Sequence, residues 1–157
     1  MDDRVRVRLV KAGWREGQPR ATDDMAGRLQ QRGFVLFAAA RAFLERYGGL
    51  RASGDSTHAR GTSTYFHTDP VEVVTDPSWV GEWEQVSGTR VFPIGATAYD
   101  EYVLLMDEHG RVFGFDPCLR MTYWADDAEE LLDVILGNGG TFRPVDPDDR
   151  RPKRDDP

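Results

Sequence analysis

Cysteine is almost absent from this chain, since Cys118 is the only one among 157 residues. A single thiol forms no internal disulfide and builds no metal site of several thiolates, so both kinds of stabilised small domain are excluded. Long apolar runs are also missing, because none approaches the roughly 20 residues that a membrane-spanning helix needs. With 39% hydrophobic residues, the chain is expected to bury one core, to stay off the membrane and to be cytoplasmic.

Histidine is scarce too, and the three that occur form no catalytic or metal-binding pattern. His58, His67 and Asp69 match none of the compact ligand spacings of metal sites, and His109 falls in a predicted hairpin loop. Cys118 lacks the Gly-rich turn of an activated nucleophile, and no Gly-rich loop carries the lysine of a phosphate site. We therefore expect no catalytic residue, no metal and no cofactor. A hydrolase that uses acids and histidines is a third class, and the sequence offers no nucleophile, base and orienting group that could be assembled for it.

Basic residues are outnumbered, with 20 Lys and Arg against 27 Asp and Glu, which gives a net charge of −7. Nucleic acid is thus an unfavourable partner, because its phosphates are bound by Lys and Arg that displace counterions. A protein with a basic surface is the better match. The same charge also has a simpler explanation, since it keeps a small domain soluble whatever it binds.

Hydrophobic spacing and stop signals predict helices early in the chain and one near its end. The expected helices cover residues 2–12, 22–33 and 36–47, a section from 69 to 88, and 125–136. The first of these segments fits both a strand and a helix, and Gly13 as a C-terminal stop favours the helix. In the last one, the acids of the first turn suit the positive end of the helix dipole.

Stretches rich in β-branched and aromatic residues predict strands. The expected strands cover residues 62–67, 91–98, 102–107, 111–115 and 141–145. The sequence Glu108-His109-Gly110 joins two of them as a hairpin loop, so these two pair antiparallel. Residues 51–60 hold few apolar side chains and are expected to form a polar loop.

These elements indicate an α+β fold. One domain, residues 1–145, is expected to pack its helices on a mostly antiparallel sheet. Residues 146–157 lack aliphatic and aromatic side chains and are expected to form a solvated polar tail.

Four short motifs occur in one order along the chain. They are AGW at 12–14, FLERYGGL at 43–50, FPIG at 92–95, and YVLLMD at 102–107 running into GRVF at 110–113. In this order they resemble the SUKH superfamily of immunity proteins, most closely its third subgroup. The resemblance implies an α+β fold and a bacterial protein that protects its own cell by binding a polymorphic toxin domain, often a nuclease or a nucleic-acid deaminase. It implies no catalytic residues.

Acidic and aromatic residues near the central strands are the candidates for partner binding. Trp79 and Trp83 share one helical face, which either packs on the sheet or is presented to a partner. Asp100 lies between two predicted strands, where acids are ordinary turn residues or, with neighbouring tyrosines, form a contact patch.

We expect the basic groove of a cognate toxin to be met by an acidic face with two aromatic anchors, Tyr99 and Trp83. The residues expected to bind the partner are Glu82, Trp83, Glu84, Tyr99, Asp100 and Glu101. The alternative is a regulatory or scaffold module of the same fold that has no toxin partner.

Overall fold

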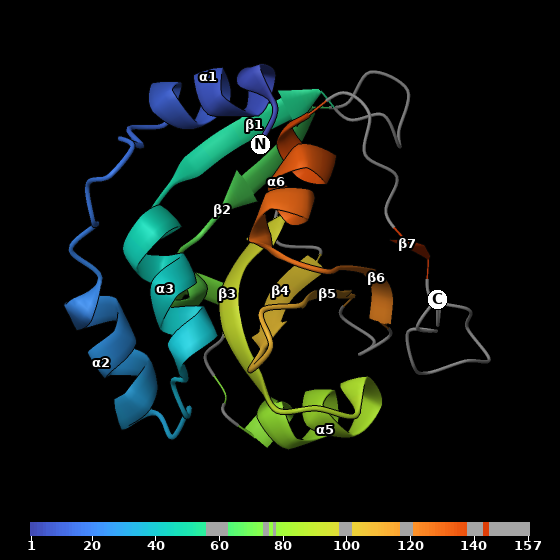
Figure 1. Ribbon diagram of the computed structural model, residues 1–157. Coiled ribbons are helices and arrows are strands. Elements are labelled where there is room, and N and C mark those ends of the chain that lie inside the picture. The colour runs from blue at the N-terminus through green and yellow to red at the C-terminus, as the bar shows by residue number, and fades with distance from the viewer. Residues whose placement is uncertain are drawn as a thin grey trace.

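The centre of the fold is one antiparallel sheet whose strands follow one another in chain order, as a computed structural model shows (Figure 1). The structure describes residues 1–55, 63–73, 76, 78–97, 102–116, 121–137 and 143–144. Within these residues the sheet has seven strands: β1 (Arg51–Asp55), β2 (Ser63–His67), β3 (Val91–Thr97), β4 (Tyr102–Asp107), β5 (Val112–Phe115), β6 (Met121–Ala125) and β7 (Arg143–Pro144). Each strand pairs antiparallel with the next, which confirms the predicted α+β class.

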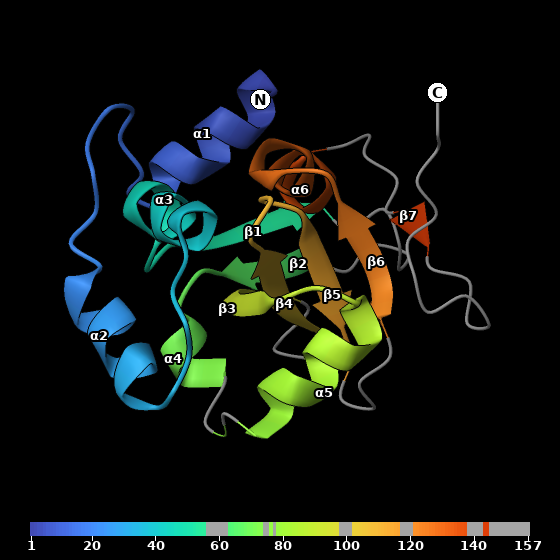
Figure 2. The ribbon, with the colours of Figure 1, turned by 60° about the horizontal axis from the view of Figure 1, so that its bottom comes forward.

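Helices cover both faces of this sheet. In the described part of the chain they are α1 (Asp3–Lys11), α2 (Asp23–Gln31), α3 (Ala38–Tyr47), α4 (Pro70–Val73), α5 (Ser78–Ser87) and α6 (Ala128–Leu136). Figure 2 shows α1, α3 and α6 on one side of the sheet and α5 on the other.

The strand register explains this division into layers. Phe92 pairs with Met106, whereas Phe115 pairs with Val103. Met106 and Val103 lie three residues apart in β4, so they point to opposite faces of the sheet. The ring of Phe92 accordingly contacts that of Phe37, just before α3, and the ring of Phe115 contacts Trp83 of α5.

The N-terminal segment, whose pattern fits a helix and a strand, is the helix α1. Asp2 caps it, since its Oδ1 accepts a hydrogen bond of 2.7 Å from the backbone N–H of Arg4. At the other end Gly13 has a φ of 93°, and the N–H of Trp14 donates to the carbonyl of Leu9. This glycine-dependent turn closes a helix and not a strand, so the predicted helix is confirmed.

Two strands differ from the prediction. β1 occupies residues 51–55, which the sequence assigns to a polar loop. Its inward residues, Ala52 and Gly54, are small because α6 lies against them: a Cβ at Gly54 would be 2.2 Å from the carbonyl oxygen of Ile135. Pairing with β2 therefore makes a strand from residues of low β propensity. β6 has no counterpart among the predicted strands, and pairing with β5 places it in the sheet.

The hairpin between β4 and β5 forms where the sequence predicts it, and a buried carboxylate organises it. The Oδ1 atom of Asp107 accepts hydrogen bonds of 2.9 Å from the backbone N–H groups of His109 and Arg111. Its Oδ2 atom accepts one of 2.7 Å from Nε of Arg111. The Asp107 side chain is completely buried and the Arg111 side chain is 26% exposed, so this charged pair is shielded from solvent and holds the turn in place. Residues 56–60 of the predicted loop and the predicted tail at 146–157 lie outside the described residues.

Candidate partner-binding surface

The exposed side of α5 contains part of the predicted partner site. Asp76 lies just before this helix, and its Oδ1 accepts a hydrogen bond of 2.8 Å from the backbone N–H of Ser78. The N–H and hydroxyl groups of Ser78 lower the pKa of the exposed Asp76 carboxyl group, so it is charged at neutral pH. Glu82 is exposed within the helix itself. The residue Asp76, before α5, and Glu82, in the middle of α5, therefore present two negative charges to solvent.

The two tryptophans of α5 have different environments. Their rings meet edge to face, with centroids 6.0 Å apart and planes at 76°. Trp83 is 1% exposed, and its ring centroid lies 6.4 Å from that of Phe115 in β5. This burial corrects the expectation that Trp83 anchors a partner, because the sheet already covers it. Trp79, at 44% exposure, is the tryptophan that a partner can reach.

The two glutamates of α5 also differ. Glu84 is half-buried, and its Oε1 accepts a hydrogen bond of 3.3 Å from the backbone N–H of Val91. This bond ties the end of α5 to the first residue of β3. Glu82 makes no hydrogen bond or ion pair within the described residues. We call Asp76, Trp79 and Glu82 the α5 surface, since these three side chains are exposed at spacings of three residues.

Three of the predicted partner residues, Tyr99, Asp100 and Glu101, lie outside the described residues. They belong to the connection between Thr97 and Tyr102, which pair at the ends of β3 and β4. Phe115, which Trp83 contacts, pairs with the residue next to Tyr102. The helix α5 thus reaches β5 through Trp83 and the first residue of β3 through Glu84.

A family model for SUKH-3 immunity proteins matches residues 1–138. The chain belongs to the SUKH-3 immunity protein family. The match covers every described element from α1 to α6, and only β7 lies beyond it. No curated protein and no solved structure matches the chain. The family match confirms the resemblance that the four sequence motifs indicate, and it supports an immunity function with a toxin as partner.

Neither of the two histidines in the described part of this SUKH-3 protein belongs to a metal-binding cluster. His67 is 1% exposed and its Nδ1 accepts a hydrogen bond of 3.3 Å from the backbone N–H of Asp69. His109 is exposed in the hairpin loop, and His58 and Cys118 lie outside the described ranges. Among the residues that the structure describes, no three His, Cys, Asp or Glu side chains lie close enough to hold a metal ion. In the same residues, no helix is long and apolar enough to cross a membrane.

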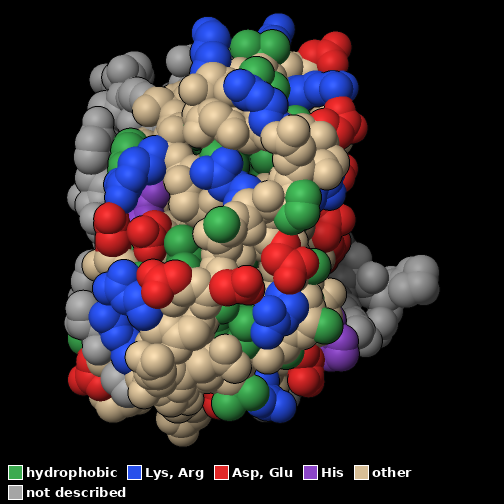
Figure 3. Space-filling model, turned by 90° about the vertical axis from the view of Figure 1, so that its left-hand side faces the viewer, with side chains coloured by type: hydrophobic (Ala, Val, Ile, Leu, Met, Phe, Trp, Pro, Cys, Tyr) green, Lys and Arg blue, Asp and Glu red, His purple; other side chains and the backbone are tan. Residues whose placement is uncertain are grey.

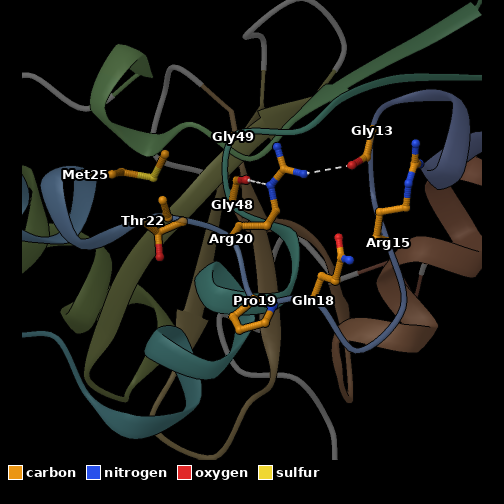
Figure 4. A pocket seen from close by; sticks show the side chains of 10 residues that line it. Gly13, Arg15, Gln18, Pro19, Arg20, Thr22, Met25, Gly48 and Gly49 are labelled. Atoms are coloured by element: carbon orange, nitrogen blue, oxygen red, sulfur yellow. Dashed lines mark hydrogen bonds between the residues drawn. The ribbon is translucent and has the colours of Figure 1, made fainter.

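A pocket of about 380 Å³ lies away from α5, where the loop after α1 meets the end of α3 (Figure 4). Arg20 crosses it: Nη1 donates a hydrogen bond of 3.2 Å to the carbonyl of Gly13, and Nε donates to the carbonyl of Gly48. The backbone N–H of Arg20 also donates to the carbonyl of Glu45 at 2.7 Å. Arg20 thus fastens the loop after α1 to α3, which gives this SUKH-3 pocket a structural role.

The surface around α5 differs in charge from the face at the left of Figure 1. On that face acidic and basic side chains are intermingled (Figure 3). Such a face has no single sign of charge with which to steer a partner at long range. The charged residues of α5 are Glu82 and Glu84, and Asp76 precedes them, so this part of the SUKH-3 protein is negative throughout. The helical pattern predicts that the two tryptophans share a face, but the burial of Trp83 involves Phe115, which is distant in sequence.

Proposed function

We propose that this SUKH-3 protein neutralises a toxin domain that acts on nucleic acid, a nuclease or a deaminase, by covering its basic substrate groove. The observation that carries the proposal is an exposed tryptophan between two acids: Trp79 is 44% exposed, and Asp76 and Glu82 are exposed three residues before and after it. Aromatic anchors of this kind are enriched among the residues that dominate binding energy.

Electrostatics supports the same partner. An enzyme that acts on nucleic acid needs Lys and Arg in its groove to bind phosphates. An acidic surface on a chain of net charge −7 attracts such a groove at long range and raises the association rate. Tyr99, Asp100 and Glu101 are included in the proposed contact as further acidic and aromatic residues. The proposal also places the protein in the cytoplasm, where such a toxin meets its substrate.

Growth rescue tests the proposal. The toxin encoded beside this gene is co-expressed with the wild-type protein, with Trp79→Ala combined with Glu82→Lys, and with Glu108→Lys as a control. Glu108 is an exposed acid in the β4–β5 hairpin, so its reversal changes the net charge equally at a different place. We expect rescue by the wild type and the control, and loss of rescue by the double variant. Equal rescue by all three proteins would move the toxin contact away from α5.

A further inference from the structure

The outer side of α1 exposes two valines to solvent. Val7 is 53% exposed and Val10 is 43% exposed, although the opposite side of the helix buries Val5 and Leu9. β-Branched residues are less favourable than alanine in a helix by roughly 0.5 kcal/mol each, because the preceding turn restricts their side chains. Two exposed valines in one short helix therefore weaken α1, and a partner that buries their methyl groups would offset that cost.

The charges around Val7 are placed symmetrically. Asp3 precedes it by four residues and Lys11 follows it by four, so the three lie along one stripe of the helix. Arg4 and Val10 flank it at three residues on either side. The side chains of Asp3, Arg4 and Lys11 make no hydrogen bond or ion pair within the described residues, so their charges are available to a partner.

We propose that α1 pairs with α1 of a second copy of this chain, antiparallel and centred on Val7. In this register Val7 meets Val7 of the other copy, and Asp3 meets Lys11 on each side of the two-fold axis. Arg4 lies opposite Val10, so its aliphatic stem covers the valine while its charge remains in solvent. The surface is therefore complementary to itself, as a two-fold interface requires.

The two copies keep their α5 surfaces apart. Figures 1 and 2 both show α1 and α5 at opposite ends of the molecule. Contact through α1 thus leaves Asp76, Trp79 and Glu82 of each copy open. This inference is independent of the toxin proposal, since it needs only the purified chain.

The expected dimer is weak. The nine residues of α1 form a helix roughly 14 Å long at 1.5 Å per residue. A single pair of such helices buries less than the roughly 1,200–2,000 Å² of a stable complex. Association is therefore expected at concentrations from about 10 μM to 1 mM, which correspond to weak complexes.

Sedimentation equilibrium over that concentration range tests the pairing. We expect the average mass of the wild type to rise towards twice that of one chain, and Val7→Ala to shift the rise to at least about tenfold higher concentration. Val35→Ala is the matched control, because Val35 is 60% exposed and lies outside α1. Val7→Ala should also unfold at the same or a higher temperature than the wild type, since alanine is the better helix former.

Charge exchange tests the register. Asp3→Lys and Lys11→Asp should each abolish the rise in mass, because each places like charges opposite one another. The variant that carries both changes should regain it. A wild type that stays monomeric to 1 mM, or single variants that associate as the wild type does, would overturn the proposal.

Discussion

Replacing Trp79 with alanine is expected to weaken toxin binding strongly and to lower the stability of the fold moderately. The exposed part of the side chain determines the first effect, and the buried part determines the second. Trp79 is 44% exposed, and a tryptophan side chain has up to about 250 Å² of surface. A partner that covers the exposed part removes about 110 Å² from water, worth about 2.7 kcal/mol at 25 cal/mol per Å². We therefore expect Trp79→Ala to raise the dissociation constant for the toxin roughly 100-fold.

The same change also affects folding. The remaining surface of Trp79, about 140 Å², includes its contact with Trp83, and its loss is expected to cost at most about 3.5 kcal/mol. A domain of ordinary stability, about 5–15 kcal/mol, stays folded after such a loss. Circular dichroism at 15 °C verifies this before binding is measured.

The assay is a calorimetric titration with a catalytically inactive toxin domain. Val35→Ala serves as a control because it removes an exposed apolar side chain elsewhere. If Trp79→Ala is folded and binds within twofold of the wild type, the toxin does not cover Trp79 and the reasoning is refuted.

Other substitutions test the fold. The hydroxyl of Tyr47 is buried without a hydrogen-bond partner in the described structure, so Tyr47→Phe is expected to be neutral or to stabilise by up to about 1 kcal/mol in urea unfolding. Burial also raises the pKa of Tyr47 in the folded chain above its unfolded value. The free energy of unfolding of the wild type therefore falls as pH rises above about 10, because the unfolded chain loses the Tyr47 proton more readily. The phenylalanine variant should lose less stability there. Gly95→Ala should destabilise by more than about 3 kcal/mol, because its Cβ would lie 2.1 Å from a β2 carbonyl oxygen. Gly27→Ala, in open space within α2, should instead raise the melting temperature slightly. Asp107→Asn should cost about 2 kcal/mol in the same unfolding assay, because a buried charge-assisted pair is lost. Deleting residues 146–157 should change neither the melting temperature nor toxin affinity, since they offer no apolar side chain for docking.

The elements that can be predicted are those whose signals lie within one segment. Gly13 ends α1, and Glu108-His109-Gly110 turns between β4 and β5 as its sequence indicates. β1 is different, because Ala52 and Gly54 lack strand propensity and the nearby backbone of α6 favours small side chains. A close approach between segments so far apart in sequence leaves no local pattern.

The candidate site follows the same rule. Periodicity predicts that Trp79 and Trp83 share a helical face, and their edge-to-face contact agrees with it. It does not determine which indole is buried, because that depends on Phe115 reaching Trp83 from β5. Glu84 is chemically the same as Glu82, yet its hydrogen bond to Val91 follows from the position of β3. The sequence thus identifies the helix, and tertiary packing determines which of its residues stay exposed to a partner.

Titration of toxin activity is the most direct test of the proposed neutralisation. The purified toxin domain, at a concentration well above the dissociation constant, is mixed with increasing amounts of this SUKH-3 protein, and its activity on nucleic acid is followed. We predict a linear fall to zero at one chain per toxin, and residual activity at the same ratio with the variant that combines Trp79→Ala and Glu82→Lys. Full toxin activity at a large excess of the wild-type protein would contradict the proposal.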